Sequence, residues 1–347
     1  MKTLFLTVLF LAVNVVLFGQ NLVHPYYLTQ YTYSDKSQYT ILKRYDSEKC
    51  VIESIGNKGK NFLANRGDTL FFKQNLLVHL MKYEWIDIDL DVHSKGGVHE
   101  TVAFRLVRDN FIKNRVIAHR GYWNDTIPRN SMAAFKRSLH LGIQGTEFDI
   151  HLTKDDRLIV NHDSDYNGVV LRRTNMTDLR KLTLPNGEVL PTLKEFLLEG
   201  IKQNRTQFVI ELKSDEESIN YARKYVVTLL NEIKQHKAQA WACYITFDIN
   251  LLRELLRYEP EASIGYLNGD LSAKDLKDLG CNVMSYRKNL WRDKPQLIDE
   301  CKKIGVASYV WTVNTEQEMD WFVEQKFEGI TSDYPDFLLK KIQKMDK

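Results

Sequence analysis

The sequence predicts an α/β protein, a (β/α)8 TIM barrel preceded by a small β-rich N-terminal domain. Three observations predict this architecture. Apolar and polar residues alternate with a period of two from about Asn21 to Arg108. After Asn114, about eight short β-branched runs alternate with amphipathic helical stretches. No G-x-G-x-x-G follows the first run, which disfavours the alternative of an open, doubly wound sheet.

Composition limits the classes of function. The chain has 347 residues, of which 44% are hydrophobic and 27% charged, so it has enough apolar residues for one large domain and a small one. The formal net charge is only +3, and no basic stripe is interleaved with aromatic residues. We therefore expect no nucleic-acid partner.

Residues 1–19 resemble an export signal. Lys2 precedes the apolar run Leu4–Val13, and a small residue, Gly19, stands before a polar stretch. The run is short and is interrupted at Asn14, so we expect no stable membrane span after signal cleavage; an uncleaved anchor is the alternative. The protein is accordingly expected to be exported, to the periplasm or the extracellular space.

Residues 20–110 are predicted to form the β-rich domain, with no obvious helix. The segment 85–92 alternates most clearly, Gly96 and Gly97 form a turn, and the segment 101–107 returns as the next strand. The role of this domain stays open between covering the barrel mouth, binding a surface and pairing subunits.

Three aspartates in the first of these strands suggest a calcium loop at first sight. Counted from Asp87, an EF-hand would need Gly where Val92 stands and Glu where Val98 stands, and both are absent. We therefore interpret Asp87, Asp89 and Asp91 as one solvated strand face.

Residues 111–347 carry the barrel pattern. The predicted strands are 116–118, 147–150, 208–210, 243–245, 263–266, 282–284, 308–311 and 329–331. Helical patterns include 131–139, 218–236 and 296–303, and residues 158–160 are predicted to return as an extra strand. The four cysteines, Cys50, Cys243, Cys281 and Cys301, form no C-x-x-C pair, so we expect isolated buried thiols and no cysteine zinc site.

Acidic residues occur at the ends of two predicted strands. Glu147 and Asp149 are two residues apart, so both side chains point to the barrel mouth. Glu211 follows the next parallel strand in the same way. Neighbouring carboxylates repel one another, and a bound cation removes that cost; carboxylates answered by Arg or Lys are the alternative. An all-oxygen set selects one hard divalent cation, Ca²⁺ or Mg²⁺.

Basic residues occur at the same strand ends. His119 and Arg120 follow the first strand, His162 follows residues 158–160, and Lys213 stands two residues after Glu211. Two histidines beside a cation and two fixed positive charges suit phosphodiester cleavage. One imidazole accepts a proton from the nucleophile while the other gives a proton to the leaving group. Gly121 is expected to let the backbone approach a ligand closely.

These motifs, in this order and spacing, resemble the glycerophosphodiester phosphodiesterase family from about Arg115 to the C-terminus. The matching segments are His119-Arg120-Gly121, Pro128-Arg129-Asn130-Ser131, Ala134-Phe135, Glu147-Phe148-Asp149, Thr153-Lys154-Asp155, His162-Asp163, Arg173-Thr174, Pro191-Thr192-Leu193, Glu211-Leu212-Lys213, Trp311-Thr312-Val313-Asn314 and residues 329–335. None of the preceding domain is covered.

The resemblance implies hydrolysis of a small-molecule glycerophosphodiester to glycerol phosphate and an alcohol, through a cyclic phosphate. It implies a metal held by Glu147, Asp149 and Glu211, with His119 and His162 as the acid–base pair. Arg120, Lys213 and Asn130 would bind phosphate or substrate. Trp311 would form a wall of the substrate pocket, with barrel packing as its alternative role. A phosphodiesterase of intact lipid or cell-surface polymer, and a non-catalytic binding barrel, are the alternatives for the whole chain. Oligomeric state stays open.

One position departs from the family pattern. The family usually has Glu before the Asn of its Pro-x-Asn-Ser/Thr segment, whereas this chain has Arg129. We expect the change either to favour a more anionic substrate or to displace Arg120, so it affects substrate identity more than catalysis.

Overall fold

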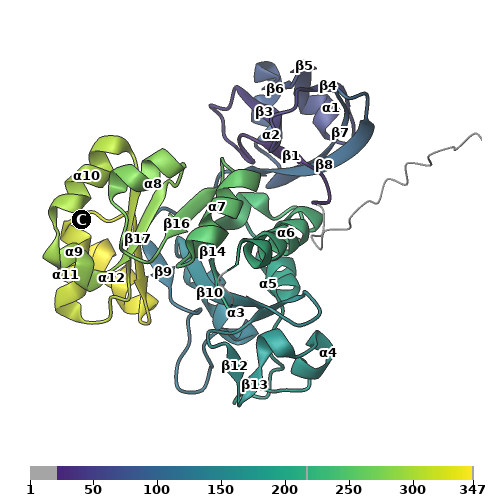
Figure 1. Cartoon of the computed structure of the whole chain (residues 1–347). Helices are drawn as coiled ribbons and strands as arrows, with labels where there is room; N and C mark the ends of the chain where they lie inside the picture. The colour runs from purple at the N-terminus through teal and green to yellow at the C-terminus, as the bar shows by residue number, and fades with distance from the viewer. Residues whose placement is uncertain (1–21, 216–217, 346–347) are drawn as a thin grey trace, which may run out of the picture.

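The computed structural model describes residues 22–215 and 218–345, which form a β-rich N-terminal unit and a barrel (Figure 1). The expected export signal, residues 1–19, lies outside the described residues. Within the described part of the chain, no helix is both long and apolar enough to cross a membrane.

The N-terminal unit contains two four-stranded sheets, ordered β1-β3-β6-β5 and β2-β8-β7-β4. Its strands are β1 (Tyr26–Leu28), β2 (Thr32–Tyr33), β3 (Tyr39–Arg44), β4 (Cys50–Ile55), β5 (Leu63–Arg66), β6 (Thr69–Phe72), β7 (Trp85–Ser94) and β8 (His99–Arg108). The expectation of no helix is wrong in detail, because two four-residue helices, α1 (Gly59–Phe62) and α2 (Leu77–Leu80), and the 3-10 turn η1 (Gln74–Leu76) connect strands. Each is a single turn, which is too short to give a helical period in the sequence.

The hairpin predicted from the alternating pattern is confirmed. β7 and β8 pair antiparallel from Trp85 opposite Val107 to His93 opposite His99. One face of β7 is buried in the core of the unit, and the other carries the three aspartates, which bond ordinary polar partners. Asp87, for example, accepts from Arg105, and Asp91 accepts from Thr101. These contacts match the interpretation of a solvated strand face.

The predicted (β/α)8 barrel is confirmed. Among the described residues, eight parallel strands close in the order β10-β14-β15-β16-β17-β18-β19-β9, and β9 pairs back with β10. These strands are β9 (Val116–Ala118), β10 (Gly145–Leu152), β14 (Gln207–Leu212), β15 (Ala242–Thr246), β16 (Ser263–Tyr266), β17 (Val283–Arg287), β18 (Ala307–Trp311) and β19 (Gly329–Ser332). The expected extra strand is β11 (Leu158–Val160), which pairs antiparallel with β10.

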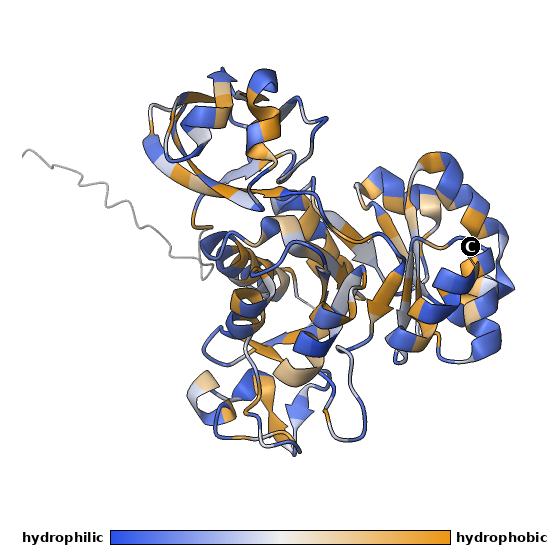
Figure 2. Cartoon of the chain, turned by 180° about the vertical axis from the view of Figure 1, so that it is seen from behind, coloured by the Kyte–Doolittle hydropathy of each residue, from blue (hydrophilic) through white to orange (hydrophobic). Residues whose placement is uncertain are grey.

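Helices surround the barrel and turn their apolar faces toward it (Figure 2). They are α3 (Met132–Leu141), α5 (Leu193–Gly200), α6 (Ile219–Gln235), α7 (Ile249–Tyr258), α8 (Ala273–Leu279), α9 (Lys288–Asp293), α10 (Gln296–Ile304), α11 (Glu316–Glu324) and α12 (Pro335–Met345). Between β11 and α5 the chain makes an excursion with β12 (Asp165–Tyr166), β13 (Val169–Val170), η2 (Leu171–Arg173) and α4 (Met176–Leu179). The turn η3 (Gln239–Trp241) precedes β15.

Local sequence explains where several helices begin. Ser131 caps α3 by accepting a hydrogen bond from the Ala134 N–H, and Thr192 and Thr315 form capping boxes at α5 and α11. The cap at α3 matters for the site, because it fixes the residue just before it, Asn130.

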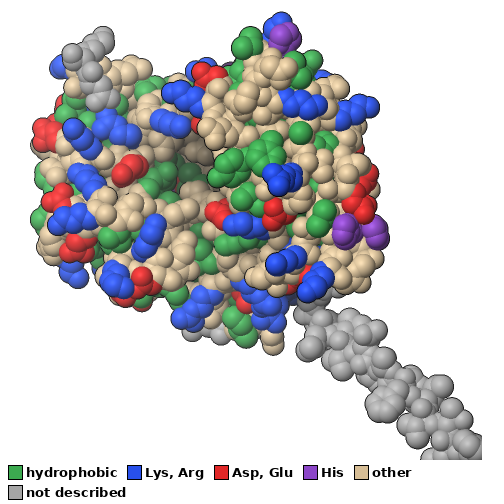
Figure 3. Space-filling model, turned by 90° about the horizontal axis from the view of Figure 1, so that it is seen from above, with side chains coloured by type: hydrophobic (Ala, Val, Ile, Leu, Met, Phe, Trp, Pro, Cys, Tyr) green, Lys and Arg blue, Asp and Glu red, His purple; other side chains and the backbone are tan. Residues whose placement is uncertain are grey.

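All four cysteines are buried and free, as expected. Acidic and basic side chains are interspersed on the face of the molecule seen in Figure 3, and no field of a single sign dominates it. That distribution agrees with the small net charge.

The N-terminal unit contacts the barrel at the end where the barrel strands begin. The Asn204 amide donates to the Arg108 carbonyl (3.0 Å), Lys237 pairs with Asp87 (3.3 Å), and Glu261 pairs with Lys43 (3.0 Å). Asn204, Lys237 and Glu261 lie in the segments that lead into β14, β15 and β16. In a parallel barrel the active face lies at the other end, so this unit does not cover the mouth. Figure 1 shows it on the opposite side from β12 and β13.

Candidate active site

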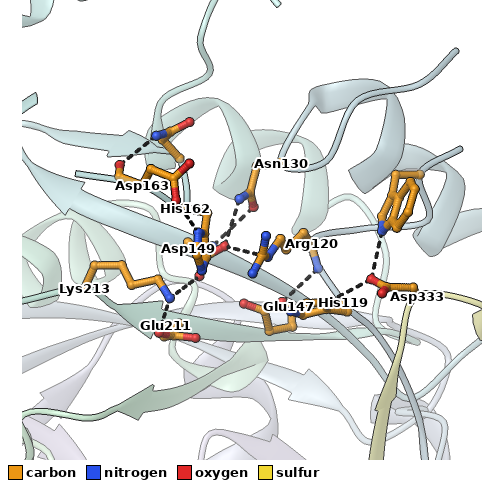
Figure 4. Close-up of polar contacts among 12 residues, drawn as sticks. His119, Arg120, Asn130, Glu147, Asp149, His162, Asp163, Glu211, Lys213 and Asp333 are labelled. Carbon is orange, nitrogen blue, oxygen red and sulfur yellow. Dashed lines mark hydrogen bonds and ion pairs between the residues drawn. The ribbon is translucent and has the colours of Figure 1, made fainter. Parts of the chain in front are cut away.

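Three carboxylates from two neighbouring strands meet at the carboxyl end of the barrel. Glu147 and Asp149 lie on β10, and Glu211 lies on β14 directly opposite Asp149 in the register. One oxygen of each lies within 4.8 Å of the others, and all three side chains are buried (Figure 4). The two-residue spacing on β10 and the parallel register therefore bring together the expected ligand set.

Hydrogen bonding leaves buried oxygens of this cluster unsatisfied. Oε1 of Glu147, Oδ1 of Asp149 and Oε1 of Glu211 are inaccessible and accept no hydrogen bond of acceptable geometry, although the Lys213 ammonium lies at ion-pair distance from the last two. Buried polar atoms are normally paired, so Oε1 of Glu147, which has no partner, calls for a ligand beside the other two oxygens. A hard divalent cation, which prefers six to eight oxygen ligands, fits this donor set.

Burial and mutual repulsion perturb the titration of the cluster. Desolvation, followed by the charges of Asp149 and Glu211, raises the pKa of Glu147 well above its usual value. Desolvation, followed by the charge of Asp149, raises the pKa of Glu211 to about 7. Burial would raise the pKa of Asp149 also, but Lys213, Asn130 and Arg120 together outweigh it and lower that pKa. The site thus favours a species that adds positive charge.

Lys213 and Arg120 approach the carboxylates in the structure. The ammonium of Lys213 lies 2.5 Å from Glu211 and 3.0 Å from Asp149, and Nε of Arg120 lies 3.6 Å from Asp149. The structure therefore also contains the alternative considered in the sequence analysis, in which basic residues neutralise the carboxylates. The oxygen Oε1 of Glu147 has no such partner, so the basic residues leave part of the cluster unsatisfied.

Asn130 bonds one carboxylate of the cluster. Its amide donates to Oδ2 of Asp149 (2.8 Å) and accepts from the Asp149 N–H (3.3 Å). Both ends of the amide are thus engaged by one residue, and the buried side chain holds Asp149 in place. These contacts place Asn130 beside the carboxylate cluster, and its expected contact with phosphate stays a prediction.

His119 is held by a carboxylate that the sequence reasoning did not single out. Nδ1 of His119 lies 2.8 Å from Oδ1 of Asp333, which also accepts from Nε1 of Trp123 (3.1 Å). Oδ2 of Asp333 accepts from the Asn314 amide (2.7 Å). Desolvation would raise the pKa of Asp333, but His119, Asn314 and Arg129 together outweigh it and lower the pKa to about 2, so this group is ionised at neutral pH. An ionised acceptor at Nδ1 leaves Nε2 of His119 for proton exchange.

His162 is more open to solvent than His119, and its Nδ1 lies 2.7 Å from Oδ1 of Asp163. Desolvation, followed by the charge of Lys213, lowers the pKa of His162, so the imidazole is neutral at pH 7. Its backbone carbonyl contacts Nε2 of His151 (3.1 Å), and Nδ1 of His151 lies 2.9 Å from Asp215. The buried His151 therefore connects β10 to the segment that carries His162.

The period of two could have identified His151. It stands two residues after Asp149 on β10, so it shares a face with Asp149 and Glu147. No comparable local signal identifies Asp333, because it lies 214 residues from its partner His119.

Both histidines line one narrow cavity of about 140 Å³. Arg120, Lys213, Glu147 and Glu211 line it as well, and Trp311 and Phe247 contribute an apolar wall. Trp311 packs edge to face on Phe247 and donates from Nε1 to the Ser285 carbonyl (2.9 Å). Trp311 thus lines this cavity, and its hydrogen bond to β17 orients the ring.

A wider groove of about 1160 Å³ adjoins this cavity, and His162, Glu211, Lys213 and Phe247 border both. Its rim is strongly acidic, with Asp163, Asp165, Asp215, Asp248 and Asp270. The catalytic face therefore joins a tight inner cavity to an open acidic entrance.

Gly121 serves helix packing. It adopts φ +79°, and a Cβ there would lie 2.8 Å from the backbone carbon of Ala134 in α3. The backbone at Gly121 does pack closely against a neighbour, as expected, and that neighbour in the structure is helix α3. A side chain would push α3 away from the turn that carries His119 and Arg120.

Arg129 does not displace Arg120. Its guanidinium stacks on the Trp123 ring, with 3.9 Å from Cζ to the ring centroid. Trp123 in turn donates to Asp333, so Arg129 acts on the environment of His119. Of the two expected effects of this departure, displacement of Arg120 is thereby ruled out.

Comparisons with known proteins agree with this geometry. The model of the glycerophosphoryl diester phosphodiesterase family matches residues 119–337. A glycerophosphodiester phosphodiesterase from Caldanaerobacter subterraneus subsp. tengcongensis is 30% identical over 251 residues, which cover 67% of this chain and 99% of that protein. A lysophospholipase D from Rattus norvegicus is 22% identical over 280 residues, covering 67% of this chain and 87% of the relative.

Solved structures are similar over the same region. The crystal structure of a glycerophosphodiester phosphodiesterase from Parabacteroides distasonis superposes with a TM-score of 0.66 at 33% identity, covering 69% of this chain and 99% of that one. An Oleispira antarctica phosphodiesterase, solved in complex with its product sn-glycerol-3-phosphate, has a TM-score of 0.58 at 24% identity, covering 67% and 97%. The second likeness concerns the fold alone.

Proposed function

Since this chain belongs to the glycerophosphoryl diester phosphodiesterase family, and is thus a phosphoric diester hydrolase, we propose that it cleaves glycerophosphodiesters with one divalent cation and two histidines. The observation that carries the proposal is the buried cluster of Glu147, Asp149 and Glu211, two of whose members, Glu147 and Glu211, line the same cavity as His119 and His162. The products would be glycerol phosphate and an alcohol.

The cation would be held by Glu147, Asp149 and Glu211, and it would supply charge neutralisation for the phosphoryl oxygens. Their all-oxygen donor set favours Ca²⁺ or Mg²⁺. Arg120 and Lys213 line the cavity and would hold the phosphate by charge-assisted hydrogen bonds. When substrate binds, its phosphate would replace part of the contacts that these two residues make with the carboxylates.

The two histidines would move the protons. One imidazole would accept the proton of the attacking glycerol hydroxyl while the other protonates the departing alcohol oxygen, and a second cycle with water would open the cyclic phosphate. Asp333 accepts a hydrogen bond from Nδ1 of His119 and so favours the tautomer whose Nε2 can exchange a proton. Asp163 favours the same tautomer of His162. Exchange of protons at Nε2 therefore needs no rearrangement of either ring.

The acidic groove suggests which alcohols are accepted. Aspartates around its rim repel an anionic group and attract a cation. We therefore propose a neutral or cationic alcohol portion, against the more anionic substrate suggested by Arg129. Hydrolysis of glycerophosphocholine and glycerophosphoethanolamine should be faster than that of glycerophosphoserine, which carries an additional carboxylate. The reverse order would contradict this assignment.

The decisive experiment measures glycerol phosphate released from glycerophosphocholine by chelated protein, before and after Mg²⁺ or Ca²⁺ is restored. We expect activity to vanish with chelator and to return with the cation. Activity that persists in chelator would remove the metal from the proposal, and absence of turnover on every glycerophosphodiester would favour a binding barrel. An intact lipid or a cell-surface polymer is the next substrate to try.

We also propose export directed by residues 1–19, because Lys2 and the apolar run that follows have the composition of a signal. The N-terminus of the mature protein, recovered from its native host and sequenced, should begin near residue 20. A mature chain that still begins at Met1 would contradict the cleavage.

A further inference from the structure

The N-terminal unit carries a second group of potential metal ligands, far from the barrel cavity. Glu53 on β4, His93 on β7 and His99 on β8 each offer one ligand atom, and these atoms lie within 4.8 Å of one another. We propose that these three residues form a binding site for a divalent transition-metal ion of the zinc type. Nothing in the proposed phosphodiesterase reaction requires this site.

The distances suit such an ion. Nδ1 of His93 lies 3.0 Å from Oε1 of Glu53, and Nδ1 of His99 lies 3.3 Å from Oε2. Ligands about 2.0–2.2 Å from a tetrahedral zinc ion are roughly 3.3–3.6 Å apart, so small side-chain rotations would complete the geometry.

The backbone fixes both histidines. His93 and His99 are directly opposite one another in the β7–β8 register, next to the hairpin turn. Their rings stack with centroids 5.4 Å apart. Because the hairpin holds the pair, both Nδ1 atoms face the same carboxylate without a loss of loop entropy at binding.

An irregularity in β4 directs Glu53 toward this pair. The register between β4 and β7 shifts between Ile52, which faces Val92, and Ser54, which faces Asp91. Glu53 is the extra residue at this shift. Bulges re-aim side chains and are common beside functional sites. Here the bulge brings a carboxylate from a third strand to the two imidazoles.

Hydrogen bonding does not account for the cluster fully. Nδ1 of His93 is inaccessible to solvent and makes no hydrogen bond of acceptable geometry, although a carboxylate oxygen is 3.0 Å away. The aspartates of the same outer face differ, because Asp87 bonds Arg105, and Asp91 bonds Ser54 and Thr101. Among the described residues of this outer face, the Glu53 cluster consists entirely of groups that can ligate a metal.

The donor types determine the class of ion. Two imidazole nitrogens and one carboxylate oxygen select zinc and its neighbours over calcium and magnesium. The barrel cluster is all oxygen and has the opposite preference. The side chains of Glu53, His93 and His99 are 42%, 36% and 64% exposed, so an ion can enter and one coordination position stays open to solvent.

For the test, the whole chain is stripped of metal, loaded with zinc and passed through gel filtration in excess Mg²⁺, which competes for the barrel cluster. The zinc that the chain retains is then measured. The variants are His93→Ala, His99→Ala and Glu53→Gln, and His79→Ala, an exposed histidine of the same unit, is the matched control. We expect each cluster variant to lose about one equivalent of zinc and to bind zinc more than about tenfold more weakly, while the control keeps both. Equal zinc content in all five proteins would overturn the site.

A measurement on the unaltered chain removes any doubt about folding of the variants. Zinc should protect His93 and His99, but not His79, from carbethoxylation by diethyl pyrocarbonate, as read by peptide mass. Equal modification of all three with and without zinc would also overturn the proposal. The cluster variants should hydrolyse glycerophosphocholine at the wild-type rate, so failure of this site and failure of the proposed function are distinguishable.

Discussion

The two histidines of the barrel cavity differ in how their imidazoles are held. His119 is tied to a carboxylate that bonds two further donors, whereas His162 is nearer the solvent and bonds the adjacent Asp163. We expect His162→Ala to lower kcat by roughly 10²–10⁴, the usual contribution of a general acid or base. His140→Ala, on the exposed face of α3, is the control and should leave turnover unchanged. Steady-state rates on glycerophosphocholine decide between these outcomes, and an unchanged rate in the first variant would refute the role.

Asp333 is expected to act by positioning His119. The Asp333→Asn variant keeps the volume of the side chain but removes the charged acceptor, which disfavours the catalytic tautomer of the ring. We expect kcat to fall by roughly 10²-fold or more with little change in KM. A purely structural role would instead lower the melting temperature and leave kcat of the folded protein intact.

The same aspartate gives a pH dependence of stability. Its pKa is lowered from 3.8 to about 2, so its ionised form is favoured in the folded protein. The contribution is therefore complete above about pH 4 and is lost as the pH falls toward 2. Acid unfolding of Asp333→Asn should show a smaller loss of stability across this window than wild type. Parallel curves for the two proteins would contradict it.

Glu211 should be necessary for metal-dependent turnover. Glu211→Ala removes one of three carboxylates, and we expect calorimetry to show loss of Ca²⁺ and Mg²⁺ binding together with loss of activity. Burial and the charge of Asp149 raise the pKa of Glu211 to about 7, and a ligand must be deprotonated. Metal affinity of the wild type should therefore weaken as the pH falls below 7. Undiminished affinity in the variant would exclude Glu211 as a ligand.

At the level of elements, the turn after β9 depends on its contact with α3. In Gly121→Ala the new Cβ would meet the Ala134 backbone at 2.8 Å and would sit at a positive φ. We expect lower stability together with a lower kcat, because the displaced turn carries His119 and Arg120. Gly168→Ala is the control, since Gly168 also has a positive φ but nothing within 4 Å of the added atom. It should cost only about 1 kcal/mol in free energy of unfolding and leave kcat unchanged. If both substitutions changed stability and kcat equally, the positive φ alone, and not the contact with α3, would explain the loss.

At the level of the whole molecule, a buried ion pair stabilises the contact between the two units. Lys234 at the end of α6 lies 3.1 Å from Glu259, and the two side chains are 1% and 6% exposed. The Lys234 ammonium also donates to the carbonyls of His24 and Tyr26 in the N-terminal unit. Removing either partner would leave a buried group uncompensated.

We expect Lys234→Met to lower the free energy of unfolding by about 3–5 kcal/mol, measured by denaturant titration. The double variant Lys234→Met/Glu259→Leu should recover much of this loss, because no unpaired charge remains. Lys181→Met, which breaks an exposed pair with Asp178, should cost less than about 1 kcal/mol. A small effect at Lys234, or a double variant no better than the single, would contradict the account.

The sequence by itself determined the barrel and most of the cavity. Strand alternation, capping residues and the two-residue spacing of Glu147 with Asp149, and of Glu211 with Lys213, are local properties. They fix which side chains emerge at a strand end, whatever the rest of the chain does. All eight predicted barrel strands are present for that reason.

Only the tertiary structure decided what those side chains touch. Asp333 reaches His119 across the closure of the barrel, Asn130 bonds Asp149, and a bulge aims Glu53 at two histidines. The N-terminal unit likewise contacts the end of the barrel opposite the mouth. Each of these contacts joins separate elements of the chain, and tertiary packing selects them, so no local period or motif in the sequence can specify them.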